Sequence, residues 1–163
     1  MRYHNITKDD MLNGEGLRTV LWVAGCSHNC PQCHNPVTWD INGGLVFDEQ
    51  AKEELFEELK KDYVSGVTFS GGDPFHLENR EEIGALAKEI REKFPDKTIW
   101  LYTGYEWEEI CHLSFLSNID VIVDGKFKIE EKDNNLHWKG SANQRVIDVK
   151  ASLRAGEVRL YQE

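Results

Sequence analysis

The chain has 163 residues, of which 40% are hydrophobic and 29% are charged, and its formal net charge is −10. These values are typical of a globular protein that can bury a substantial core, and they exclude a collagen-like, low-complexity or wholly disordered chain. The acidic balance argues against a protein that coats nucleic acid. No run approaches the roughly 18 to 20 apolar residues of a membrane span, and the N-terminus lacks the apolar segment of a signal peptide. We therefore expect a cytoplasmic protein, in which clustered cysteines stay reduced.

In chain order, short apolar runs rich in β-forming residues alternate with amphipathic helical patterns. The first segment, to about residue 16, is polar and rich in turn-forming residues. Strands are predicted over residues 18–24, 66–70, 98–102 and 119–123, with two further strands at 145–149 and 157–161. Helices are predicted from Asp48, as N-cap, to about residue 61, then over residues 79–94 and about 106–112.

Strands that alternate with helices favour βα units and a parallel sheet, so the predicted fold class is α/β. The sequence has no internal repeat and no linker composition, which predicts a single domain over residues 1–163. Four unusual turns each follow the C-terminal end of a predicted strand, namely a cysteine-rich loop and residues 71–74, 103–105 and 124–126. Because ligands bind at this edge of parallel α/β folds, the four turns predict one composite site.

The cysteine-rich loop carries Cys26, Cys30 and Cys33 in the spacing C-x3-C-x2-C. Such closely spaced thiolates can converge on one metal centre, but they supply three ligands where a closed tetrahedral site needs four. One interpretation is a zinc knuckle completed by His28, His34 or Cys111, although the chain has no second pair of ligands at zinc-site spacing. An iron–sulfur cluster with one open iron fits better. Cys111 then reads as a small buried hydrophobic residue.

Two other turns have both a functional and a structural interpretation. Gly71-Gly72-Asp73-Pro74 can be an ordinary turn, but paired glycines also let a ligand approach the backbone closely. The segment from Trp138 to Arg145 is rich in hydrogen-bond donors that could hold a carboxylate or a protein partner, and an exposed loop is the alternative.

Taken together, these motifs resemble the radical S-adenosylmethionine enzymes and, within them, the activases of glycyl-radical enzymes. The resemblance is closest to the activating proteins of anaerobic ribonucleoside-triphosphate reductase, and it runs from about residue 3 to residue 148. Besides the three cysteines and Gly71–Pro74, the motifs that carry it are Asn13-Gly14-x-Gly16-x-Arg18, Cys33-His34-Asn35, Thr38-Trp39, Gly43-Gly44, Thr103-Gly104-Tyr105, Asp124-Gly125-Lys126 and Gly140-Ser141-x-Asn143-Gln144.

The resemblance implies a truncated, open, partial TIM-type barrel and a [4Fe–4S] cluster held by Cys26, Cys30 and Cys33. It implies that S-adenosylmethionine binds the open iron and is cleaved reductively to place a glycyl radical on the reductase partner. A low-potential donor such as a flavodoxin or a ferredoxin would supply the electron. The cofactor contacts that it implies are Gln32, Cys33, His34, Gly71, Gly72, Asp73 and Thr103.

Two departures and two rival functions follow from the same residues. Gln32 stands where many relatives carry an aromatic residue, and Lys139 stands where arginine is expected, which removes a bidentate donor. The first rival is an activase of another glycyl-radical enzyme, of the formate-lyase type. The second is a zinc-stabilised binding module without catalytic chemistry.

Overall fold

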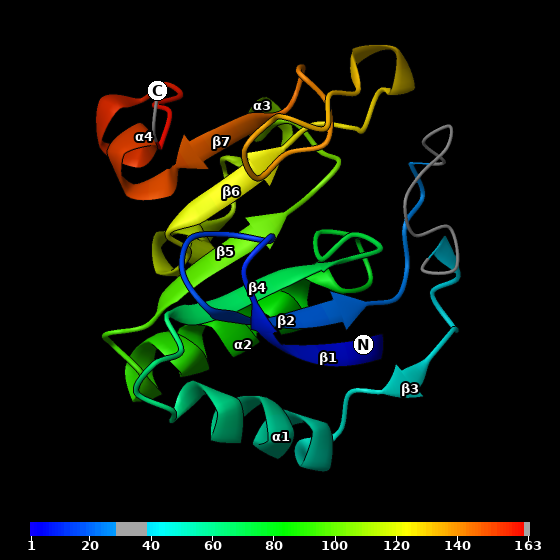
Figure 1. The fold of residues 1–163 in the computed structure, drawn as a ribbon, viewed down its shortest axis with the longest axis vertical. Coiled ribbons are helices and arrows are strands. Elements are labelled where there is room, and N and C mark those ends of the chain that lie inside the picture. The colour runs from blue at the N-terminus through cyan, green and yellow to red at the C-terminus, as the bar shows by residue number, and fades with distance from the viewer. Residues whose placement is uncertain (29–38, 162–163) are drawn as a thin grey trace.

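The computed structural model describes residues 1–28 and 39–161. Within these residues, seven strands form one sheet in the order β3-β1-β2-β4-β5-β6-β7 (Figure 1). The strands are β1 Arg2–Asp10, β2 Arg18–Val23, β3 Leu45–Val46, β4 Gly66–Gly71, β5 Thr98–Tyr102, β6 Val121–Asp124 and β7 Arg145–Asp148. The helices are α1 Glu49–Leu59, α2 Arg80–Lys93, α3 Trp107–Ile110 and α4 Val149–Ala155, with 3-10 turns η2 Ser114–Asn118 and η3 Ile129–Glu131.

The centre of the sheet is parallel and its borders are antiparallel. Strands β2, β4, β5 and β6 pair in parallel, whereas β1 pairs antiparallel with β2 and β3, and β7 pairs antiparallel with β6. Parallel neighbours require crossover connections, and α1 and α2 provide two of them. The predicted α/β class with parallel units in an open, partial barrel is confirmed.

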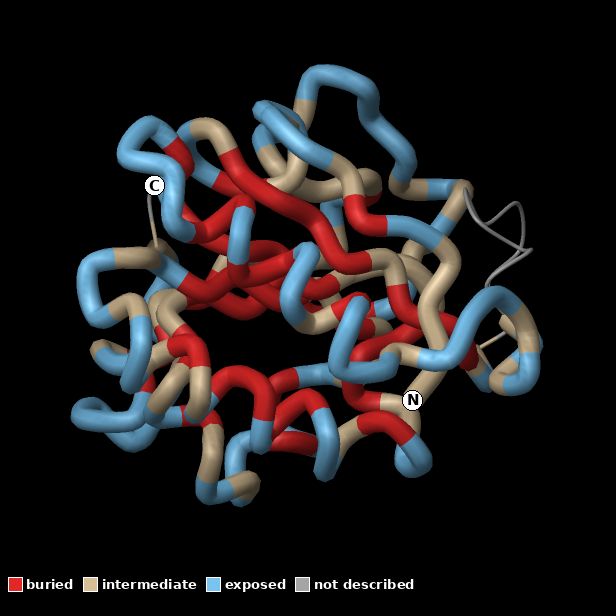
Figure 2. The backbone as a smooth tube through the Cα atoms, turned by 90° about the horizontal axis from the view of Figure 1, so that it is seen from below, coloured by how far each residue is buried: buried red, intermediate tan, exposed pale blue. Residues whose placement is uncertain are grey.

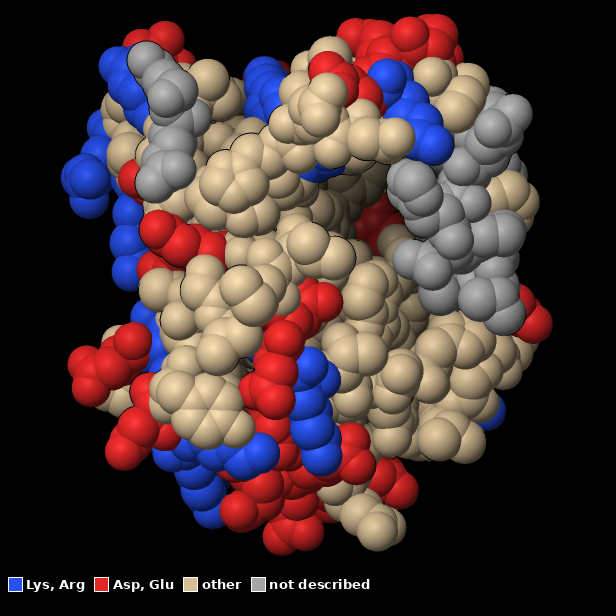
Figure 3. Space-filling model, viewed as in Figure 1, with Lys and Arg blue, Asp and Glu red and all other residues tan. Residues whose placement is uncertain are grey.

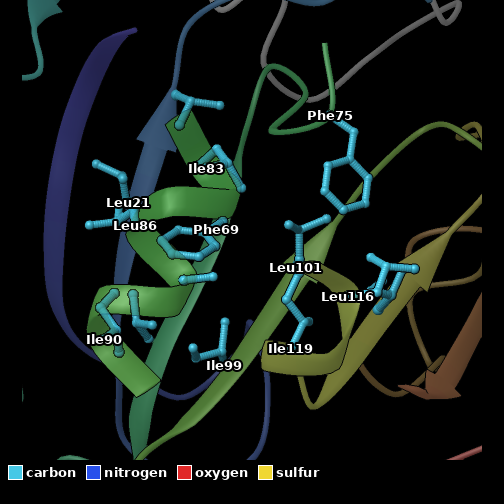
Figure 4. Close-up of a cluster of buried hydrophobic side chains, with 14 of the residues drawn as sticks. Leu21, Phe69, Phe75, Ile83, Leu86, Ile90, Ile99, Leu101, Leu116 and Ile119 are labelled. Carbon is cyan, nitrogen blue, oxygen red and sulfur yellow. The ribbon is translucent and has the colours of Figure 1, made fainter. Parts of the chain in front are cut away.

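One face of the sheet packs against the helices, as the alternation of side chains along a strand requires. In β4 and β5 the inward residues Phe69 and Leu101 join this layer, which also takes Ile83 and Ile90 from α2 (Figure 4). Asp48 caps α1 by accepting a hydrogen bond from the Ala51 amide (2.9 Å), as predicted. Figure 2 shows the buried backbone concentrated in the strands and on the helix sides that face them.

The other face of the sheet carries a smaller cluster built from the alternate positions of the same strands. Trp100, Val121 and Val123 are buried there, and Trp138 and Tyr161 pack against them from the C-terminal third of the chain. The indole of Trp138 meets that of Trp100 edge to face, at a centroid distance of 4.9 Å. Tyr102 and Trp138, which pack against this cluster, also line the cavity described below.

Several predictions about the ends of the chain are wrong. The polar first segment forms β1, because its backbone pairs with β2 although only Ile6 of the strand is buried. Residues 157–161 form no strand beyond a single bridge from Leu160 to Ile147. The helix α4 was not predicted, although Asp148 caps it and Gly156 ends it with a left-handed φ of 74°.

The prediction for Cys111, in the middle of the chain, is also wrong. Cys111 is exposed, not buried, because it follows the short α3 at the surface. Among the described residues, no helix has the length and apolar character to cross a membrane.

Candidate functional site

The described residues form a cavity of about 390 Å³ at the C-terminal ends of the parallel strands. Cys26 after β2, Gly71 and Gly72 at the end of β4, and Thr103 and Gly104 after β5 contribute to its lining. The volume lies within the range of small-molecule sites, about 300 to 1,000 Å³. Figure 3 shows the surface hollowed on the side viewed in Figure 1, with mostly uncharged residues around the opening. The predicted meeting of turns at one sheet edge is therefore present.

The Gly71–Pro74 turn is bonded directly to the beginning of the cysteine loop. The Gly72 amide donates to the Val23 carbonyl (2.8 Å), and the Asp73 amide donates to the Gly25 carbonyl (2.7 Å). Gly71 has a φ of +102°, and a Cβ at this position would lie 2.5 Å from the Val23 nitrogen. Only glycine permits this close approach. The end of β4 can therefore bond to the end of β2, the strand that leads into Cys26.

Asp73 is 1% exposed, and its carboxylate lies behind the wall of the cavity. Its Oδ2 lies 2.6 Å from Nε2 of His28 and accepts hydrogen bonds from the Thr103 hydroxyl (3.0 Å) and the Gly104 amide (2.9 Å). Its Oδ1 accepts from the Phe75 amide (2.8 Å). One carboxylate thus joins the ends of β2, β4 and β5.

The opposite wall of the cavity comes from the segment that precedes β7. The amide oxygen of Gln144 accepts from the backbone of Gly140 (3.0 Å) and Ser141 (3.1 Å), and its nitrogen donates to the Gly125 carbonyl (2.9 Å). The Lys139 ammonium donates to the backbone carbonyl of Gln144 (2.9 Å). The segment was ambiguous in the sequence, and the structure places Lys139, Gly140 and Gln144 on the cavity.

Two more side chains fix this wall. The Tyr102 hydroxyl donates to the Trp138 carbonyl (2.6 Å), and burial raises the pKa of this tyrosine, so it remains a neutral donor at physiological pH. Asp124 is buried at the end of β6 and accepts hydrogen bonds from Arg145 (2.6 Å) and from the Trp107 amide (2.8 Å). The hydrogen bond to Asp124 raises the pKa of Arg145, which stays charged. The Asp-Gly-Lys turn therefore contributes a structural carboxylate and, at Gly125, part of the cavity lining.

The predicted site residues fall into three groups. Cys26, Gly71, Gly72 and Thr103 line the cavity, whereas Asp73 lies behind its wall. The predicted positions outside the described residues are Cys30, Gln32, Cys33 and His34. Sequence reasoning considered His28 only as a possible zinc ligand and gave no role to Tyr102, and both residues line the cavity. For His28, its place between two cysteines was the available signal.

The described part of the site fits an iron–sulfur cluster that binds a small organic ligand. Cys26 lines the cavity, as do the glycines at 71, 72 and 104, which have no side chain to fill it. In residues 1–28 and 39–161, no three His, Cys, Asp or Glu side chains form an alternative metal site. The Nε2 atom of His28 is engaged by Asp73, and Cys111 is exposed after α3. The described residues therefore give no support to a zinc knuckle completed by either of these two side chains.

Comparison with known proteins identifies the family. A family profile described as "4Fe-4S single cluster domain" matches residues 12–147. The chain is 44% identical over 146 residues to the anaerobic ribonucleoside-triphosphate reductase-activating protein of Enterobacteria phage T4, covering 90% of this chain and 93% of that protein. It is 40% identical over 150 residues to the protein of the same name from Salmonella typhi, and 39% identical over 150 residues to that of Escherichia coli K12. Each of these two alignments covers 90% of this chain and 97% of the relative.

The resemblance seen in the sequence motifs is thus confirmed over nearly the whole chain, and several of the motifs in the described residues contribute side chains or backbone to the cavity at the strand ends. The chain belongs to the family of anaerobic ribonucleoside-triphosphate reductase-activating proteins and carries a 4Fe-4S single cluster domain.

Proposed function

We propose that this protein is a radical S-adenosylmethionine activase that installs a glycyl radical on an anaerobic, class III ribonucleoside-triphosphate reductase. The observation that carries the proposal is the cavity that places Cys26 beside the glycine turns at the ends of β4 and β5. The names of the relatives support the reductase as the protein substrate and favour it over a partner of the formate-lyase type. We further propose that residues 1–163 are one radical-SAM domain, since all seven described strands join one sheet.

We assign Cys26, Cys30 and Cys33 as the ligands of a [4Fe–4S] cluster, because three thiolates leave one iron open for a ligand from the substrate. When bound, the cluster and S-adenosylmethionine supply the one-electron reductive chemistry that generates the glycyl radical. The remaining contribution of the chain is to bind, to orient and to exclude water.

Binding and orientation come from the two walls of the cavity. The Gly71-Gly72 turn approaches the end of β2 closely and offers backbone groups to an amino-acid moiety. On the opposite wall, the Lys139 ammonium and the Gly140 backbone lie at the cavity, where a cation favours a carboxylate. Gln32, Cys33 and His34 remain proposed contacts of the same ligand, and Thr103 lines the cavity beside it.

Exclusion of water comes from aromatic and aliphatic side chains at the rim. Trp22, Phe127 and Trp138 line the cavity together with Leu12 and Leu136. A low-dielectric surrounding of this kind protects a reactive radical from side reactions with solvent. The target glycine of the reductase has to reach this opening, so the active species is a complex of the two proteins.

The electron donor and the compartment complete the proposal. A low-potential protein such as a flavodoxin or a ferredoxin is the proposed reductant. We place the activity in the cytoplasm, because the cluster requires reduced thiolates and thiols stay reduced there.

The experiment that tests the cluster assignment is anaerobic reconstitution with iron and sulfide, followed by analysis of iron and acid-labile sulfide. A brown protein that cleaves S-adenosylmethionine when reduced is expected, and Cys30→Ala should abolish both properties. Bound zinc without acid-labile sulfide would support the binding module instead. Undiminished cleavage by Cys30→Ala would remove this cysteine from the ligand set.

A further inference from the structure

The Asp73 carboxylate is engaged by four donors from the protein. An ionised carboxylate offers about four lone-pair sites. In this structure Asp73 already accepts from His28, from Thr103 and from the backbone amides of Gly104 and Phe75, at 2.6 to 3.0 Å. Three of these donors converge on Oδ2 and one reaches Oδ1, and the residue is only 1% exposed. The carboxylate of Asp73, which the family resemblance implies as a cofactor contact, is therefore directed at protein groups.

The most informative of these groups is His28. Only 7% of its side chain is exposed, although it belongs to the loop between Cys26 and Cys30. A carboxylate has only acceptors, so the proton in the 2.6 Å contact lies on Nε2 of the imidazole. The contact spans 45 residues of sequence and joins the cysteine loop to the turn that follows β4.

The ring of His28 also explains why residue 104 is a glycine. A Cβ at Gly104 would lie 2.5 Å from Cδ2 and 2.7 Å from Nε2 of that ring. Gly104 is not among the glycines with a left-handed φ, so its backbone conformation does not by itself require glycine. The requirement comes from the imidazole that packs on it.

An aromatic side chain, Tyr105, also packs against the imidazole of His28. Tyr105 meets the imidazole edge to face at a centroid distance of 4.7 Å, and the Arg80 guanidinium lies 5.2 Å from the centre of the Tyr105 ring. Asp73, Gly104 and Tyr105 thus form one surface that holds the imidazole. Asp73 accepts its hydrogen bond, Gly104 lies in close contact with it and Tyr105 packs against its ring.

We propose that His28 is a positioning residue that fixes the start of the cysteine loop against this surface and so sets where the Cys26 thiolate stands. The proposal rests on the proposed cluster and assigns His28 no ligand role. It gives the Thr-Gly-Tyr motif a physical purpose: Thr103 orients Asp73, Gly104 leaves space for the ring and Tyr105 closes it.

A double-mutant cycle tests this proposal. The variants are His28→Ala, Gly104→Ala and the double variant, with His28→Gln as the conservative change that keeps a donor and His112→Ala as an exposed control. The first measurement is the rate at which an iron chelator removes the reconstituted cluster. We expect His28→Ala to lose iron about tenfold faster, the scale on which residues around metal ligands act. His28→Gln should lie closer to the wild type, and His112→Ala should match it.

Gly104→Ala alone should behave like His28→Ala, because the added methyl group displaces the ring. In the His28→Ala background the same substitution should cost little, which gives a non-additive cycle. Removing a donor from the buried Asp73 also lowers the thermal stability of the iron-free chain, so iron loss is compared at a temperature well below the unfolding of every variant, where a faster loss reports loop position. Additive losses, or a wild-type rate in His28→Ala, would overturn the proposal.

The iron-free chain gives a second measurement that does not depend on the cluster. The Gly104 amide donates to Asp73, and the ring of His28 covers it. Its hydrogen exchange should become faster in His28→Ala, and unchanged exchange would contradict the proposal. A wild-type chain that takes up no cluster would instead refute the proposed function. Failure of the His28 proposal and failure of the proposed function therefore give different results.

Discussion

Gln144 donates its side-chain amide to the Gly125 carbonyl over 2.9 Å, which ties the end of β6 to the segment before β7. The oxygen of the same amide accepts from the backbone of Gly140 and Ser141. One side chain thus supports the cavity wall opposite the glycine turn of β4.

Replacing Gln144 by alanine should weaken the binding of S-adenosylmethionine and leave cluster content unchanged. The loss of three hydrogen bonds lets this wall move, and an effect equivalent to about one net hydrogen bond is roughly tenfold in Kd. Equilibrium binding to the reconstituted protein measures it. Gln50→Ala, on the exposed side of α1, is the matched control. Equal affinity in Gln144→Ala and the control would show that the wall does not contact the ligand.

Arg18 stabilises the fold from the opposite end of the sheet. Its buried guanidinium donates to both the hydroxyl and the carbonyl of Thr98, to Thr68, and to the carbonyls of Val67 and Glu15. Burial lowers its pKa to about 10, so it is still charged at neutral pH.

Arg18→Lys should lower the free energy of unfolding by about 2 kcal/mol or more, because a single ammonium cannot replace a fork of five donors. Denaturant unfolding of the iron-free protein measures the change. Arg154→Lys, exposed in α4, should have no comparable effect. A loss as small as that of the control would mean that the acceptors find other partners.

The elements with a strong hydrophobic period were predictable from the sequence, and the contacts between distant segments were not. The helix of residues 80–93 agrees with the prediction because its buried positions recur at the helical period, and the strand at 98–102 agrees because it is a short apolar run buried on both faces of the sheet. β1 was missed, because it is held by backbone pairing and buries only Ile6. The cysteine spacing pointed to the site, but the contact of His28 with Asp73 depends on how β2 and β4 pair, which a local pattern does not contain.

Tyr161 gives the fold a dependence on alkaline pH. Burial, followed by its hydrogen bond to Glu15, raises the pKa of this tyrosine from 10.0 to about 12. A group whose pKa is raised in the folded state contributes stability that is complete below pH 10 and is lost as the pH rises through about 12. The free energy of unfolding should therefore fall across this window.

Unfolding measured between pH 9 and 12, a range of about three units chosen to bracket the ordinary tyrosine pKa, checks this dependence. Tyr161→Phe removes the titrating hydroxyl and should flatten the fall relative to the wild type. Tyr63→Phe, at an exposed tyrosine, should keep the wild-type slope. Parallel curves for wild type and Tyr161→Phe would assign the alkaline loss to other groups.

The proposed function depends on radical transfer from this protein to its partner. The most direct measurement is the EPR spectrum of an anaerobic ribonucleoside-triphosphate reductase after incubation with the reconstituted protein, S-adenosylmethionine and a reductant. A glycyl-radical signal should form on the reductase and be absent with Cys30→Ala or with a formate-lyase-type partner. A wild-type protein with a complete cluster that leaves the reductase without a radical, or a radical formed equally well by Cys30→Ala, would contradict it.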